Sequence, residues 1–201
     1  MNQPIITAGL DEVGWGACAG PIISVVAIFK GAANIPPGVR DSKKTSEAQR
    51  DMLYFPLLQI AHDVGIGWAW PWEVDVNPRK ALQLSYQRAL EGVSPSRLPE
   101  LLIVDGTNAV ESWSGKQQVE PKADSNHWQV SAASIIAKVY RDNIMRELDK
   151  IHPQYNWAGN KGYGTDDHRA AIAKHGLLID LDNRSKYIHR QRYCRNFKIG
   201  P

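Results

Sequence analysis

Residues 5–16 read IITAGLDEVGWG, and the rest of the chain is organised around this stretch. A short apolar run ends in two adjacent acids, Asp11 and Glu12, and a turn with two glycines follows at residues 14–16. The run predicts a buried strand that brings two carboxylates to the edge of a sheet. Because burial disfavours each anion and the two anions repel each other, the pair predicts a neighbouring cation.

Length and composition favour one globular domain. The chain has 201 residues, of which 43% are hydrophobic, enough for one core of ordinary size. No apolar run approaches the roughly 20 residues that span a bilayer. The first predicted strand begins too early to leave room for a secretory signal. We therefore expect a cytoplasmic, monomeric protein with no membrane partner. The two cysteines, Cys18 and Cys194, do not indicate a disulfide framework.

The C-terminal segment is basic, although the whole chain carries a net charge of only +3. No acid follows Asp182, whereas six basic residues do: Arg184, Lys186, Arg190, Arg192, Arg195 and Lys198. Such a segment suits a polyanionic partner such as a nucleic acid. A solvated tail is the alternative interpretation, and the charges alone do not exclude it.

Strand and helix signals are interspersed along the chain and predict one compact α/β domain. After the first strand, further strands are predicted over residues 20–29, 64–72 and 101–105. Helices are predicted from a capping box at Ser46 and Gln49, from Asn77-Pro78 to about Leu90, over residues 130–149, and from Thr165 to Gly176. Pro56 is expected to kink or end the first of these helices. Residues 112–129 are expected to be irregular.

A second predicted strand repeats the pattern of the first, because residues 101–105, LLIVD, end in an acid and Gly106 follows. If the two strands are neighbours, Asp11, Glu12 and Asp105 converge at one edge of the sheet. A cluster of oxygen ligands without Cys or His suits Mg²⁺ or Mn²⁺. Two such ions can activate water and stabilise the leaving oxygen in phosphodiester hydrolysis. Spacing alone leaves open the alternative of surface acids at strand ends.

Five blocks stand out along the chain: AGLDEVGWGACAGP, DSKK, VDGTN, KADSNHWQVSAASIIAKVYRD and NKGYGT. In this order and at these spacings they resemble the type 2 ribonucleases H, ribonuclease HII in particular, from about Ile6 to about Tyr193. The resemblance implies a ribonuclease-H-like mixed β-sheet flanked by helices, with a helical C-terminal part. It implies a single domain over residues 1–201, with a catalytic core over about residues 1–150 and a substrate-contacting part over about residues 151–201.

The same resemblance implies an endoribonuclease that hydrolyses the RNA strand of RNA–DNA hybrids. It also implies cleavage 5′ of ribonucleotides embedded in duplex DNA, with 3′-hydroxyl and 5′-phosphate products, as part of ribonucleotide excision in DNA replication and repair. The family depends on a divalent cation, Mg²⁺ or Mn²⁺, with two ions in each active site. Its catalytic and metal-binding acids match Asp11, Glu12, Asp105 and Asp124. Asp142 also matches a family position, but we interpret it as structural because it lies well inside a predicted helix.

The residues that the resemblance assigns to substrate binding are Gly14, Trp15, Gly16, Lys43 and Tyr163. The 2′-hydroxyl distinguishes RNA from DNA, and the backbone of a Gly-x-Gly turn can approach it closely. Tyr163 matches a tyrosine that stacks on the sugar beside the ribonucleotide, and Lys43 matches a lysine that contacts phosphate. Residues 189–193 resemble a basic family element only loosely, so we expect general phosphate affinity there.

Trp15 is the main departure from the family, which usually has Gly-Arg-Gly at this turn. An indole carries no charge and cannot replace a bidentate guanidinium at a phosphate, whereas main-chain contacts of the glycines can persist. Two alternatives therefore stand beside the family activity. One is a duplex-binding protein with weak or lost cleavage, and the other is a nuclease that cuts only long hybrids. The four acids argue against a pure binding protein, because anions facing phosphates do not favour binding.

Overall fold

The computed structural model describes residues 5–31, 35–39 and 45–195. They form two compact units, each assembled from separate stretches of the sequence. The sheet unit comprises residues 1–13, 23–68 and 83–139, and the helical unit comprises residues 14–22, 69–82 and 140–201. Lys43 lies outside the described residues, so its expected phosphate contact stays a prediction. The expected division of one domain near residue 150 also stays a prediction.

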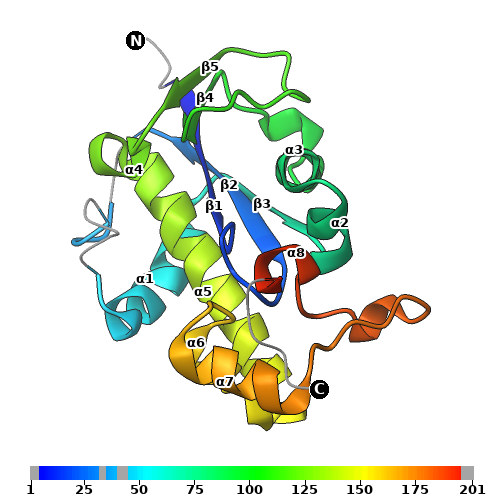
Figure 1. Ribbon diagram of the computed structural model, residues 1–201. Coiled ribbons are helices and arrows are strands. Elements are labelled where there is room, and N and C mark those ends of the chain that lie inside the picture. The colour runs from blue at the N-terminus through cyan, green and yellow to red at the C-terminus, as the bar shows by residue number, and fades with distance from the viewer. Residues whose placement is uncertain (1–4, 32–34, 40–44, 196–201) are drawn as a thin grey trace. The chain divides into compact units, whose positions relative to one another are not determined.

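The sheet unit contains a five-stranded mixed sheet with the strand order β3-β2-β1-β4-β5 (Figure 1). Its strands are β1 (Ile6–Val13), β2 (Ile22–Lys30), β3 (Asp63–Ala69), β4 (Leu101–Asp105) and β5 (Gln117–Glu120). β1 is antiparallel to β2 and parallel to β4, and β4 is parallel to β5. The first eight residues of β2 are all buried, which explains why this strand is almost continuously apolar.

The helices are α1 (Glu47–Ile60), α2 (Pro71–Val76), α3 (Pro78–Glu91), α4 (Ala123–Asn126), α5 (Trp128–Ile151), α6 (Trp157–Asn160), α7 (Asp166–His175) and α8 (Gln191–Cys194). Short 3₁₀ helices are η2 (Pro95–Arg97), η3 (Pro153–Tyr155) and η4 (Arg184–Lys186). In the part of the chain that the structure describes, no helix combines the length and the apolar character that a bilayer crossing requires.

α3 and α5 lie against opposite faces of the sheet, and glycines allow the close approach (Figure 1). A Cβ atom on Gly9 of β1 would lie 2.2 Å from the backbone of Gln129 in α5. A Cβ atom on Gly65 of β3 would lie 1.9 Å from the carbonyl oxygen of Ala89 in α3. The helix backbones therefore rest directly on the strands at these two points, where a larger side chain would push them away.

The helical unit is built around stacked aromatic side chains. The rings of Tyr155 and Trp157 are stacked, with centroids 4.9 Å apart and an interplanar angle of 12°. The Trp157 indole N–H donates a hydrogen bond to Nε2 of His168 at 3.0 Å, so the polar atom of this buried ring is satisfied. The buried cluster comprises Cys18, Ala19, Met145, Tyr155, Trp157, Ile172, Ile188 and Cys194.

The most strongly patterned predictions are confirmed. The helix predicted over residues 130–149 is α5, which is longer by a few residues. Ser46 and Gln49 form the predicted capping box at the start of α1. Asn77 caps α3, since its side chain accepts a hydrogen bond from the N–H of Lys80 at 3.1 Å.

Two local predictions are wrong, and of the two outcomes expected at Pro56, a kink or an end of the helix, the end is excluded. The strand predicted over residues 64–72 ends at Ala69, because Pro71 begins α2, a position that favours proline in a helix. Residues 112–129 contain β5 and α4 instead of irregular chain. α1 does not end at Pro56 but continues to Ile60. One missing backbone hydrogen bond is tolerated there because the next residue, Leu57, is completely buried.

Candidate active site

Asp11 and Asp105 lie at the ends of adjacent parallel strands. Leu10 of β1 pairs in register with Val104 of β4, and each acid is the next residue of its strand. Residues in register share a face of the sheet, so the two carboxylates leave the sheet on the same face. α5 covers this face, and its Ser134 side chain forms a hydrogen bond with Asp11. β1 and β4 are therefore neighbours, which is the condition on which the expected convergence of these acids depends.

Glu12 leaves the sheet on the opposite face. Its Oε2 accepts a hydrogen bond from the hydroxyl group of Tyr86 in α3 at 2.7 Å. Ser24, which pairs with Glu12 across β1 and β2, lies 2.6 Å from the hydroxyl oxygen of Ser85 in α3. The backbone N–H of Glu12 donates to Oδ1 of Asp11 at 2.8 Å. Two neighbouring residues thus direct their acids toward two different helices.

Asp124 belongs to α4, which begins beside Asp105. The backbone N–H of Ala123 donates to Oδ1 of Asp105 at 2.7 Å, and Asp124 is the next residue. Asp124 is only 4% exposed, and it lines a cavity of about 430 Å³ together with Trp128. Asp105 therefore lies between the acids of β1 and the acid of α4. All four predicted acids belong to the sheet unit.

The carboxylates destabilise one another in their ionised forms. Burial raises the pKa of Asp11 well above its usual range, and the charges of Glu12 and Asp105 raise it further. Burial also raises the pKa of Glu12, against the opposing effect of the hydrogen bond from Tyr86. Among the described residues, no three His, Cys, Asp or Glu side chains are arranged as a ready-made metal site. Asp11, Glu12 and Asp105 each accept a hydrogen bond from a protein donor instead.

The Gly-x-Gly turn lies in the helical unit. Gly14 has a φ of +85°, which favours glycine, and a Cβ atom there would lie 2.2 Å from Nε of Arg141. At Gly16, in contrast, a Cβ atom would meet no atom within 4 Å. Trp15 between them is 39% exposed. The turn therefore presents an indole and an accessible stretch of main chain to its surroundings.

Arg190 binds the carbonyl groups of this turn. Its Nη1 donates to the carbonyl oxygens of Gly14 and Trp15, at 2.7 and 3.0 Å. Its Nε and Nη2 donate to the carbonyl oxygen of Gly20, at 2.9 and 2.7 Å. Arg190 is completely buried, and burial together with the charge of Arg141 lowers its pKa to about 9. The side chain is thus still a cation at neutral pH.

Arg141 connects the same loop to the segment that carries Tyr163. Its guanidinium group donates to the carbonyl oxygens of Ala19 and Lys161, at 2.9 and 2.8 Å. Its Cζ lies 5.5 Å from the centre of the Tyr163 ring, which is a cation–π distance. The carbonyl oxygen of Gly162 accepts the N–H of Ala19 at 3.0 Å. The helical unit therefore brings Tyr163, which is 36% exposed, into one scaffold with the Gly-x-Gly turn.

Comparison with known proteins identifies the family. The family model for ribonuclease HII matches residues 8–196. The chain belongs to the ribonuclease HII family. The ribonuclease HII of Wolbachia pipientis subsp. Culex pipiens is 42% identical over 174 residues, which cover 86% of each chain. The ribonuclease HII of Jannaschia sp. is 40% identical over 173 residues, which cover 86% of this chain and 85% of the relative.

Solved structures agree with this family. The ribonuclease H2 from Pyrococcus horikoshii OT3 has a TM-score of 0.75 at 26% identity, covering 96% of this chain and 97% of that one. Bst-RNase HIII, solved in complex with Mn²⁺, has a TM-score of 0.74 at 18% identity, covering 98% of this chain and 70% of that one. The second comparison shows the fold alone. The expected ribonuclease-H-like fold and the expected enzyme class, a ribonuclease H endonuclease, are confirmed.

Sequence reasoning missed both buried arginines of this chain. Arg141 lies in the block SAASIIAKVYRD, and Arg190 lies in the basic C-terminal segment. We expected general phosphate affinity in that segment, and this is wrong for Arg190, whose donors face carbonyl oxygens in the interior. Arg192 is exposed only two residues further on. Composition does not distinguish the two, because burial at this point depends on contacts with a turn about 175 residues earlier.

Proposed function

We propose that this chain hydrolyses the RNA strand of RNA–DNA hybrids and cuts 5′ of ribonucleotides embedded in duplex DNA. The observation that carries the proposal is that several acids lie close together at the ends of two neighbouring strands. Asp11 and Asp105 share a face of the sheet, and Asp124 follows the residue whose N–H binds Asp105. Substrates of this kind occur where chromosomal DNA is replicated, which fits the expected cytoplasmic location.

The four acids are proposed to hold two Mg²⁺ or Mn²⁺ ions. The donor set fits, since carboxylate oxygens are the preferred ligands of hard divalent cations. Burial, and then repulsion from the neighbouring acids, raises the pKa of Asp11, and a bound cation would offset both effects by stabilising the ionised form. When bound, the ions would lower the pKa of water and neutralise negative charge at the scissile phosphate.

The chain itself orients these acids. Tyr86 donates to Glu12 and favours its ionised form, and the N–H of Ala123 fixes one oxygen of Asp105. Each hydrogen bond leaves the second oxygen of its carboxylate for another partner. Held in this way, the acids need little reorganisation to meet a cation, which is how preorganised groups contribute to catalysis.

Recognition of the ribonucleotide is proposed for the Gly-x-Gly turn and Tyr163. The open space around Gly16 would allow the backbone to approach a 2′-hydroxyl, the group that separates RNA from DNA. The partly exposed ring of Tyr163 would stack on a neighbouring sugar. Lys43 is proposed to contact a phosphate.

Replacing Trp15 with arginine is expected to raise kcat/KM on a DNA duplex with a single ribonucleotide by about tenfold. The guanidinium group would supply a charge-assisted contact to a phosphate, worth about 1.5–3 kcal/mol. Trp15 is exposed, so the change should not disturb the fold. Trp113→Arg, at an indole of the sheet unit, is the control for an added charge. Equal gains in the two variants would contradict a specific role for position 15.

The proposed function is tested with three labelled duplexes in Mg²⁺ and in Mn²⁺: all DNA, DNA with one ribonucleotide, and a full RNA–DNA hybrid. We expect cleavage 5′ of the lone ribonucleotide and throughout the hybrid, with 3′-hydroxyl ends and no cutting of all-DNA duplex. Cutting of the hybrid alone would support the alternative of a hybrid-only nuclease, which the uncharged Trp15 favours. Binding without any cutting would support a duplex-binding protein instead.

A further inference from the structure

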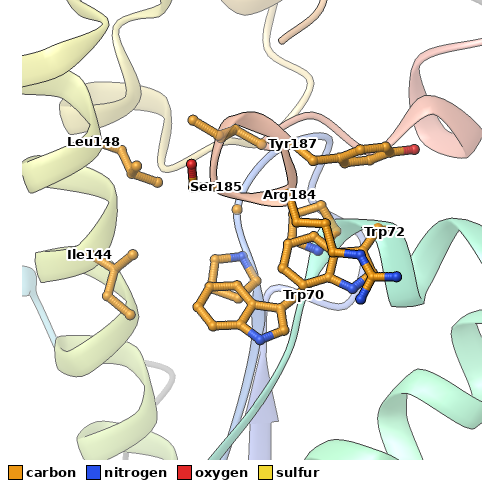
Figure 2. Close-up of a pocket in the computed structure, with 11 residues that line it drawn as sticks. Trp70, Trp72, Ile144, Leu148, Arg184, Ser185 and Tyr187 are labelled. Atoms are coloured by element: carbon orange, nitrogen blue, oxygen red, sulfur yellow. The ribbon is translucent and has the colours of Figure 1, made fainter. Parts of the chain in front are cut away.

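An apolar cavity of about 400 Å³ opens in the helical unit, and no residue assigned above to catalysis or substrate binding is among the residues that line it. Four segments line it: Gly20 and Pro21 before β2, the segment around the start of α2, the second half of α5, and η4 with the two residues that follow it. Figure 2 shows Ile144 and Leu148 of α5 on one side of the space and Trp70 and Trp72 across from them. This volume lies in the range of pockets that bind small organic groups.

The wall formed by α2 is a stack of two indoles. The rings of Trp70 and Trp72 have centroids 5.3 Å apart and an interplanar angle of 10°. Tyr187 meets Trp72 edge-on, with centroids 6.4 Å apart. Trp70, which lines the cavity, is 38% exposed. The stack therefore offers a flat aromatic face to an incoming planar group.

The charged side chain that lines the cavity is positive. The guanidinium carbon of Arg184 lies 5.7 Å from the centre of the Trp72 ring (Figure 2), and Lys186 in the same 3₁₀ helix is exposed. Arg184 is the sole charged residue among the described ones that line the cavity. Asp75 of α2 accepts hydrogen bonds from the Tyr187 hydroxyl group at 2.8 Å and from backbone N–H groups of α8.

We propose that this pocket binds an unpaired base of a single-stranded nucleic-acid segment, with the adjoining phosphate on Arg184. Nucleobases are planar and stack on aromatic side chains whatever their sequence, and a guanidinium group is the preferred partner of a phosphate. An apolar peptide could pack against the indoles, but it has no negative charge to pair with Arg184. Bases inside a duplex are stacked on one another and do not enter such a pocket. The pocket would therefore bind single-stranded segments that flank the proposed duplex substrates.

The test measures binding of a labelled oligothymidylate of about 12 nucleotides to the full chain by fluorescence anisotropy, in EDTA. Trp70→Ala is expected to weaken binding about fivefold or more, since base stacking on an aromatic side chain contributes at least this factor. Arg184→Gln is expected to weaken binding and to flatten its dependence on salt. The controls are Trp113→Ala and Lys174→Gln, which remove an indole and an exposed cation elsewhere and should stay within about twofold of the parent.

Ser185→Trp provides a second variant, because it fills the pocket without removing an aromatic wall. It is expected to lose single-strand affinity as Trp70→Ala does, with unchanged affinity for a blunt all-DNA duplex. If Trp70→Ala and Ser185→Trp both bind the oligothymidylate as tightly as the control Trp113→Ala does, the proposal is overturned. Equal losses for single strand and blunt duplex would overturn it as well, because they would show a general contact instead of a site for an unpaired base.

Discussion

Asp11→Asn is expected to lower cleavage of an RNA–DNA hybrid by at least about a thousandfold while leaving duplex affinity within about twofold. Asparagine keeps the shape of the side chain but supplies no negative charge to a divalent cation, and electrostatic stabilisation by such a group is typically worth factors of 10²–10³ or more. Cleavage is followed by gel assay in Mg²⁺, and binding by anisotropy in EDTA. Turnover above one per cent of the parent would contradict the assigned role.

The same variant is expected to be more stable than the parent when no metal is present. Burial and the neighbouring acids raise the pKa of Asp11 in the folded state, whereas the unfolded chain keeps a pKa of about 4. Ionised Asp11 therefore costs stability above the folded pKa, and this cost disappears as the pH falls below the unfolded pKa. In EDTA at pH 7, a gain of about 1 kcal/mol would raise Tm by about 2–4 °C.

Asp166→Asn is the matched control, because it removes a carboxylate that is fully exposed at the start of α7. It should change neither cleavage nor Tm measurably. The difference in Tm between Asp11→Asn and the parent should shrink as the pH falls toward about 4. A lower Tm for Asp11→Asn at pH 7 in EDTA would show that the hydrogen bonds of Asp11 outweigh the repulsion from its neighbours.

Arg190→Ala is expected to lower the free energy of unfolding by about 3 kcal/mol or more, equivalent to a Tm lower by at least about 6 °C. The substitution leaves the carbonyl oxygens of Gly14, Trp15 and Gly20 without their buried donor, and each unsatisfied group costs about 1–3 kcal/mol. Because the turn loses its support, activity on a single embedded ribonucleotide should fall more than activity on a long hybrid.

Arg190→Lys and Arg195→Ala make this prediction specific. A lysine keeps the charge but has no planar fork to reach three carbonyl oxygens, so its Tm should lie between those of the parent and Arg190→Ala. Arg195 is exposed in the same basic segment, and its loss should leave Tm within about 1 °C. If thermal denaturation gives the same Tm for Arg190→Ala and Arg195→Ala, the buried hydrogen bonds do not support the turn.

The sequence predicted structure correctly where the functional residues lie at the end of a clear local pattern. An apolar run that ends in acids predicts both a strand and the carboxylates at its end, which is why Asp11 and Asp105 could be placed at strand ends. Trp70 and Trp72 were assigned to a strand, although Pro71 between them already favours the start of a helix. Arg190 could not be assigned from the sequence, because its burial depends on a turn at the other end of the chain.

The way Arg190 and Arg141 hold the Gly-x-Gly loop has a consequence for the evolution of this enzyme. Both arginines bind main-chain oxygens, so the loop keeps its shape whatever side chain occupies its central position. Trp15 can therefore vary without cost to folding, whereas Gly14 cannot, since a Cβ atom there would collide with Arg141. Because this scaffold is independent of the side chain that we propose contacts the substrate, substitutions at position 15 can change substrate preference without loss of the fold, which makes it a suitable site for saturation mutagenesis.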